Sequence, residues 1–177
     1  MERGNFLFIS YSLPSEPSRI RVSTWRWLKK IGALNIQKSL WLLPDTARTK
    51  DSLKKIKDYI ENEKGSVYIA SGNFLYGKED IKGKFIDEIN REYEELLGFC
   101  TRFHEEMKKE TQKENFTFAE LEENDEELKK LYSWFEKINK RDYFKSEKGE
   151  AINKEIQLCS NEFEEFSKTV YERNNIV

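Results

Sequence analysis

The chain has 177 residues, of which 37% are hydrophobic, 36% charged and 14% aromatic, and its formal net charge is −2. The aromatic share excludes an intrinsically disordered chain, because such chains lack the large apolar side chains that form a core. The sequence has no apolar run that could span a bilayer and only 2 cysteines, so we expect a cytoplasmic protein with no membrane partner and no disulfide framework.

The charges are unevenly distributed along the chain. Residues 1–72 hold 13 Lys/Arg and 7 Asp/Glu, a balance of +6, whereas residues 73–177 hold 18 Lys/Arg and 26 Asp/Glu, a balance of −8. This asymmetry predicts that the first part of the chain meets an anion. The alternative interpretation is that the two parts attract each other.

The first predicted elements are a strand and a helix. Residues 5–13 are rich in Phe, Ile and Tyr, which predicts a strand that ends before Pro14. Ser18 is expected to cap a helix that ends near Gly32. The residues predicted to share the inward face of this helix are Ile20, Thr24, Trp27, Leu28 and Ile31.

The next segments complete a pattern of the βαββαβ type. Short strands are predicted over residues 33–37 and 40–43, and one strand with a kink near Lys38 is an open alternative. A helix over about residues 50–64 and a last strand over residues 67–70 follow. This order predicts the ferredoxin-like arrangement, in which a sheet carries two helices on one face.

Longer helices are predicted in the second part of the chain. The spacing of apolar residues predicts an amphipathic helix over about residues 80–111, a helix that starts at Asn124 as its N-cap, and a third helix over about residues 148–173. We therefore predict an α+β fold with a ferredoxin-like βαββαβ subdomain over residues 1–73 and a three-helix, bundle-like subdomain over residues 74–177.

The densest basic cluster lies on the first predicted helix. At 3.6 residues per turn, Arg19, Arg26, Lys29 and Lys30 fall opposite the apolar face. Arg21 lies on the flank of the helix beside Trp25. Guanidinium groups match the geometry of phosphate and other tetrahedral oxyanions, so this surface predicts binding of DNA or of an oxyanion such as chromate. The alternative is a solvated face whose cations pair with acidic residues elsewhere in the chain.

Cys100 and His104 are four residues apart and share a helix face, and with Cys159 they could supply three soft metal ligands. Cys100 also continues the apolar stripe of its helix, so we favour a structural role and expect neither a metal nor another cofactor. His104 is the only histidine, and no spacing marks a partner that would orient it in a Cys/His nucleophile pair. No complete catalytic motif is present, so an enzyme is not the favoured interpretation.

Short motifs along the chain resemble the ChrB family of chromate-resistance regulators. The first stretch contains Arg21-Val22, Trp25-Arg26, Leu28, Gly32-Ala33 and Leu43-Pro44, and the later segments are residues 91–96 and 136–144. The resemblance implies a regulator of a chromate-inducible resistance operon that acts through DNA binding or chromate sensing. It also implies that Arg21, Trp25 and Arg26 are the best functional candidates.

The predicted βαββαβ order also resembles the fold of the small CRISPR spacer-acquisition nuclease and of a domain in phenylacetate-type repressors. In that nuclease family the first strand ends in an Asp that supports a metal, whereas Tyr11-Ser12 stands at the corresponding place here. A hydroxyl is a poor Mg²⁺ ligand compared with a carboxylate, so we expect no nuclease activity. A homodimer through the sheet stays an open alternative.

Three functions are therefore open. The first is a regulatory protein that binds DNA or an oxyanion such as chromate through its basic first helix. The second is a chromate-reducing or other redox enzyme that uses the thiols of Cys100 and Cys159. The third is a non-catalytic protein-interaction module whose acidic helical part docks a partner.

Overall fold

Four strands form one antiparallel sheet among the residues that the computed structural model describes, which are 5–76 and 78–174, with side chains from 81 onward in the second range. They are β1 (Phe6–Ser12), β2 (Leu34–Gln37), β3 (Leu40–Pro44) and β4 (Ser66–Gly72). Their order across the sheet is β2-β3-β1-β4, and each neighbouring pair is antiparallel. This order confirms the predicted ferredoxin-like arrangement.

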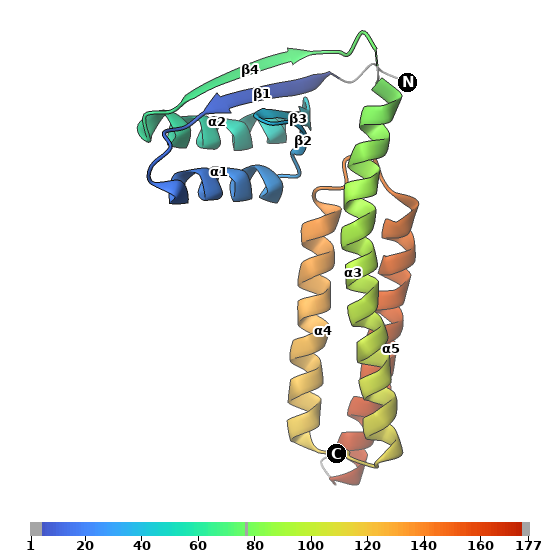
Figure 1. The fold of residues 1–177 in the computed structure, drawn as a ribbon. Helices are drawn as coiled ribbons and strands as arrows, with labels where there is room; N and C mark the ends of the chain where they lie inside the picture. The colour runs from blue at the N-terminus through green and yellow to red at the C-terminus, as the bar shows by residue number, and fades with distance from the viewer. Residues whose placement is uncertain (1–4, 77, 175–177) are drawn as a thin grey trace. The chain divides into compact units, whose positions relative to one another are not determined.

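The two helices α1 (Ser18–Lys30) and α2 (Ala47–Asn62) lie side by side on one face of this sheet (Figure 1). The core of this part contains apolar side chains from both helices and from the strands. Among its members with the least exposure are Ile9, Leu28, Leu42, Leu43 and Ile60. The burial of these side chains supplies the main stabilisation of the α1–sheet and α2–sheet layers.

The N-termini of α1 and α2 differ from the predicted ones, because a proline occupies the N-cap of α1 and a capping box forms at the start of α2. Ser18 is the first residue of α1 and not its cap, because the extended Pro17 takes the N-cap position without a side-chain hydrogen bond. Helix α2 starts at Ala47 because Thr46 and Thr49 form a capping box, in which Thr46 Oγ1 accepts from the Thr49 backbone N–H at 3.1 Å.

Three long helices follow: α3 (Lys78–Gln112), α4 (Phe118–Asn139) and α5 (Glu147–Arg173). The prediction that α4 starts at Asn124 is wrong. Asn124 is buried inside the helix and donates to the Glu120 carbonyl at 2.8 Å, while Thr117 caps the helix by accepting from the Glu120 backbone N–H. The T-x-x-E pattern of residues 117–120 is a helix-start signal that precedes Asn124.

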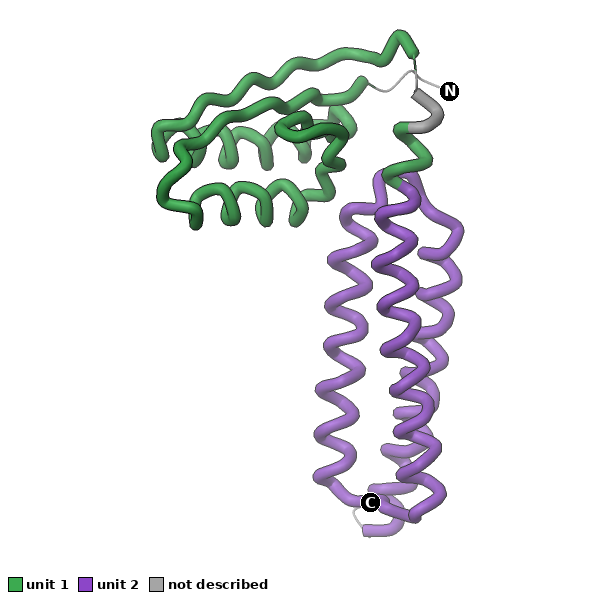
Figure 2. The backbone as a smooth tube through the Cα atoms, in the orientation of Figure 1, with its two compact units in different colours: residues 1–85 green, residues 86–177 purple. Residues whose placement is uncertain are grey.

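The chain divides into two compact units, residues 1–85 and 86–177 (Figure 2). The start of α3 belongs to the first unit, in which Phe85 stacks on Phe6 with the ring centroids 6.3 Å apart. In the second unit α3, α4 and α5 share one apolar core, and the predicted three-helix bundle is confirmed. Within the described residues, no helix combines the length and the apolar character that crossing a membrane requires.

Candidate anion-binding surface and thiol cluster

Helix α1 exposes one side because its buried residues are spaced by four. Ile20, Thr24 and Leu28 face the core, so residues on the opposite side of the helix face solvent. Trp27 was predicted to face inward but lies at the border of that face. Its side chain is 39% exposed, and its ring meets Tyr59 of α2 edge-on at 5.3 Å.

The six predicted residues of α1 form one surface, which we call the basic face: Arg19, Arg21, Trp25, Arg26, Lys29 and Lys30. Arg19, Arg21, Arg26 and Lys30 are exposed, and Trp25 is 49% exposed. Lys29 is half-buried, with its Nζ 5.8 Å from the centroid of the Trp41 ring.

The four exposed cations of the basic face are not engaged by the chain's own acidic groups. Across the described ranges, no ion pair or hydrogen bond joins the side chains of Arg19, Arg21, Arg26 or Lys30 to another residue. By contrast, Lys50 of α2 contacts Asp45 at 2.7 Å, and Lys57 contacts Glu61 at 2.6 Å. These four cations are therefore available to an external anion.

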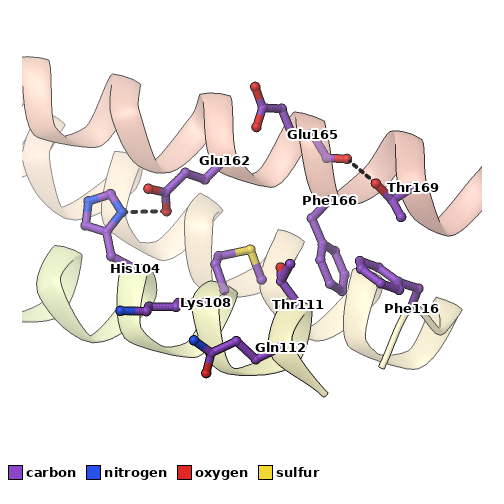
Figure 3. Close-up of a pocket in the computed structure, with 10 residues that line it drawn as sticks. His104, Lys108, Thr111, Gln112, Phe116, Glu162, Glu165, Phe166 and Thr169 are labelled. Atoms are coloured by element: carbon purple, nitrogen blue, oxygen red, sulfur yellow. Dashed lines mark hydrogen bonds and ion pairs between the residues drawn. The ribbon is translucent and has the colours of Figure 1, made fainter. Parts of the chain in front are cut away.

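A second group of reactive side chains lies in the bundle, and we call it the thiol cluster: Cys100, His104, Glu155, Cys159 and Glu162. Both cysteines are fully buried. The Cys159 sulfur lies 3.9 Å from the Cys100 carbonyl oxygen and 3.4 Å from His104 Nε2. The imidazole contacts two carboxylates: Nδ1 is 2.6 Å from Glu162 Oε2 (Figure 3), and Nε2 is 3.3 Å from Glu155 Oε1.

The two thiols shift each other's pKa in opposite directions. The neighbouring Cys159 thiol lowers the pKa of Cys100, although burial opposes this shift. The Cys100 thiol, together with burial, raises the pKa of Cys159. The pair therefore loses its two protons in two separated steps.

The sequence marked no partner that would orient His104, but the structure supplies one in Glu162. Glu155, Cys159 and Glu162 are spaced by four and three, so they share a face of α5. This spacing could have predicted from the sequence that the two glutamates share a face of α5 with Cys159. The spacing does not predict which residues of α3 this face contacts, because those contacts depend on the register between the two helices. The described residues contain no group of three or more His, Cys, Asp or Glu side chains arranged to hold a metal ion.

A groove with a volume of about 490 Å³ opens beside the thiol cluster. His104 and Glu162 line one end of it, and the aromatic rings of Phe116 and Phe166 line the other (Figure 3). Lys108 and Gln112 of α3 lie along its side. The groove joins the imidazole of a buried cluster to solvent.

Comparison with known proteins found one family. The model of the family described as "Protein ChrB, N-terminal" matches residues 21–176 and so extends over both units. Neither the curated proteins nor the solved structures contained a match to this chain.

Proposed function

Because this chain belongs to the ChrB N-terminal family, which is related to chromate resistance, we propose that it is a regulatory protein that binds the phosphate backbone of DNA through the basic face of α1. The observation that carries this proposal is the set of four exposed cations on one helix that no described acidic group engages. Cations of this kind neutralise phosphates and release condensed counterions.

The length of the basic face favours a polymer over a small anion. Arg19 and Lys30 are separated by eleven helical steps, or about 16 Å along the axis. One DNA strand advances about 3.4 Å per phosphate, so the face extends along several phosphates. The side chains project from the convex surface of a helix, whereas a tight site for one oxyanion needs donors that converge on it.

The exposed indole of Trp25 adds a contact that charge alone does not provide. Arg21 and Trp25 are four residues apart and lie on the same flank of α1. An exposed tryptophan can pack on sugars or on an unstacked base while the guanidinium contacts phosphate. The basic face therefore combines positioning contacts to the backbone with one aromatic contact.

Fluorescence anisotropy with a labelled DNA duplex of mixed sequence tests the proposal. Affinity should fall steeply between about 50 and 200 mM salt. The triple variant R19Q/R21Q/R26Q should bind at least about tenfold more weakly, and its salt slope should decrease in magnitude by about three.

The matched control is K137Q/K154Q/K168Q, which removes the same charge from exposed lysines of α4 and α5. It should change the affinity by less than about threefold, because these lysines lie outside the basic face. Equal losses in both triple variants would contradict the proposal, because they would indicate a response to net charge alone. Absence of binding by folded protein at low salt would also contradict it.

A further inference from the structure

The two cysteines of the chain are 59 positions apart, yet the Cys159 sulfur lies 3.9 Å from the carbonyl oxygen of Cys100 in the core of the bundle. Cys100 lies on α3 and Cys159 on α5, and both side chains are buried in the one apolar core that these helices share. Two buried cysteines that face each other from neighbouring helices can be joined by one disulfide without a distant segment having to move to meet them. No other cysteine is present to compete for the bond.

The surroundings of this pair are polar in a way that packing does not require. A cysteine used only to fill a core is usually surrounded by apolar side chains. Here the imidazole of His104 lies 3.4 Å from the Cys159 sulfur, and Glu162 holds the opposite ring nitrogen at 2.6 Å. With Nδ1–H donated to the Glu162 carboxylate, the Nε2 lone pair is directed at the Cys159 thiol, where it can accept a proton. The Glu155 carboxylate also lies 3.3 Å from Nε2 and stabilises the imidazolium that forms when Nε2 takes up a proton.

Solvent reaches the cluster from the side of the imidazole. The His104 side chain is 22% exposed, and it lines the groove beside Glu162 (Figure 3). Both sulfurs are fully buried behind the imidazole, so a small neutral oxidant such as hydrogen peroxide is the class of reagent that fits the site, whereas a protein partner is too large to reach them.

We propose that Cys100 and Cys159 are a redox-active pair that a peroxide converts into a disulfide between α3 and α5, with His104 as the base and Glu162 as a positioning residue. The Cys100 sulfur attacks one peroxide oxygen, the O–O bond breaks, and the thiol proton leaves with the second oxygen as water. Cys100 is thereby oxidised to a sulfenic acid.

The second step closes the disulfide. The Cys159 sulfur attacks the Cys100 sulfur, the S–O bond breaks, and the proton of Cys159 passes through His104 Nε2 to the departing hydroxide, which leaves as water. In total, two thiols lose two electrons, and one peroxide is reduced to two waters. The site thus makes the bundle a sensor of peroxide-class oxidants, independently of DNA binding.

The experiment uses the full chain, reduced and then exposed to hydrogen peroxide while circular dichroism confirms that it stays folded. Both free thiols should be lost together, and the intact mass should fall by about 2 Da, as expected for one intramolecular disulfide. Peptide mapping without reduction should recover Cys100 joined to Cys159. Folded protein that keeps both thiols, or that gains oxygen without a disulfide, would overturn the proposal.

Variants of the polar residues test the assigned roles. H104Q should slow disulfide closure by at least about tenfold, so that a sulfenic acid accumulates on Cys100 and can be trapped by a dione reagent. E162Q should slow closure less, and E162D should restore most of the rate because it keeps the carboxylate.

Glu165 provides the matched control, because it lines the same groove one turn from Glu162 and, among the described residues, neither a hydrogen bond nor an ion pair joins its side chain to His104. E165Q should close the disulfide at the wild-type rate. Equal rates in H104Q, E162Q and E165Q would show that the imidazole takes no part in closure, and would overturn the role assigned to it.

Discussion

Arg141 and Glu92 form a bidentate ion pair, in which Nη1 donates to Oε1 at 2.8 Å and Nη2 donates to Oε2 at 2.6 Å. The neighbouring residues also meet, because the Tyr93 hydroxyl donates to Asp142 Oδ2 at 3.3 Å. These contacts join the two later segments that carry the resemblance to the ChrB family, residues 91–96 and 136–144. In this chain those segments brace α3 against the turn between α4 and α5.

The Arg141–Glu92 pair should contribute measurably to stability, because its side chains are only 17% and 33% exposed. R141K keeps the charge but loses the planar fork, so we expect the free energy of unfolding to fall by about 1–2 kcal/mol. Urea denaturation followed by circular dichroism measures this loss.

The exposed pair of Lys129 and Asp125 provides the comparison. K129Q should lower the free energy of unfolding by less than about 0.5 kcal/mol, because solvent screens an ion pair of this kind. Losses of equal size in R141K and K129Q would show that the fork geometry adds nothing.

Gly149 lies where a side chain would collide with Tyr93. A Cβ atom at position 149 would be 2.9 Å from the Tyr93 hydroxyl and 3.2 Å from Cζ. The Tyr93 ring is fully buried and bonded to Asp142, so it cannot move aside cheaply. We expect G149A to lower the free energy of unfolding by about 1–3 kcal/mol, although alanine is the better helix former.

Three further variants, Y93F, Y93F/G149A and G98A, separate the collision from other effects of G149A. In a Y93F background, which removes the hydroxyl, the cost of G149A should shrink. G98A in α3 should instead raise the stability by up to about 1 kcal/mol, because nothing lies within 4 Å of the added Cβ. Thermal or urea unfolding of the wild type, G149A and these three variants tests the explanation, and a cost of G149A that is equal with Tyr and Phe at position 93 would contradict it.

The order and type of the elements could be predicted because the hydrophobic period changes clearly along the chain. Helix ends were harder to predict, since several residues near each end can act as caps. Asn124 is a favourable N-cap by type, yet Thr117 starts α4, because the acidic turn between them is stable as helix at the positive end of the helix dipole. Local preference alone does not choose between two such starts.

The two candidate sites also differ in how far the sequence predicts them. The basic face lies on one helix, so its side chains could be placed from the helical period alone. The thiol cluster needs two helices, and the period of each helix leaves open which turn of α3 meets which turn of α5. The contact of His104 with Glu162 therefore appears only in the folded bundle.

Glu110 predicts a dependence of stability on pH. Asn115 donates to its Oε2 at 2.5 Å, and this bond, with help from Lys113 and Lys109, lowers the pKa of Glu110 below its ordinary value of 4.5. A carboxyl whose pKa is lowered on folding stabilises the folded state above its unfolded pKa. This contribution should be lost as the pH falls from about 5 through the folded pKa.

E110Q should therefore show a smaller loss of stability between about pH 5 and pH 3 than the wild type. E105Q, on an exposed position of the same helix, should follow the wild-type curve. Urea midpoints measured across this pH range test the prediction, which fails if E110Q and the wild type lose stability in parallel.

Two buried threonines of the first unit predict opposite effects of the same substitution. Thr24 Oγ1 is buried under α1 and has no hydrogen-bond partner among the described residues, whereas Thr49 Oγ1 donates to the Pro44 carbonyl at 2.6 Å and accepts from the Thr46 backbone N–H at 3.0 Å. Valine keeps the shape of threonine and removes its hydroxyl.

T24V should raise the free energy of unfolding by about 1 kcal/mol, because a buried hydroxyl without a hydrogen-bond partner is removed. T49V should lower the free energy of unfolding by about 1–3 kcal/mol, because two hydrogen bonds are lost. Because T24V leaves the basic face intact, it should also bind DNA as the wild type does. Changes of the same sign in T24V and T49V would show that the Thr24 hydroxyl finds a partner in the folded protein.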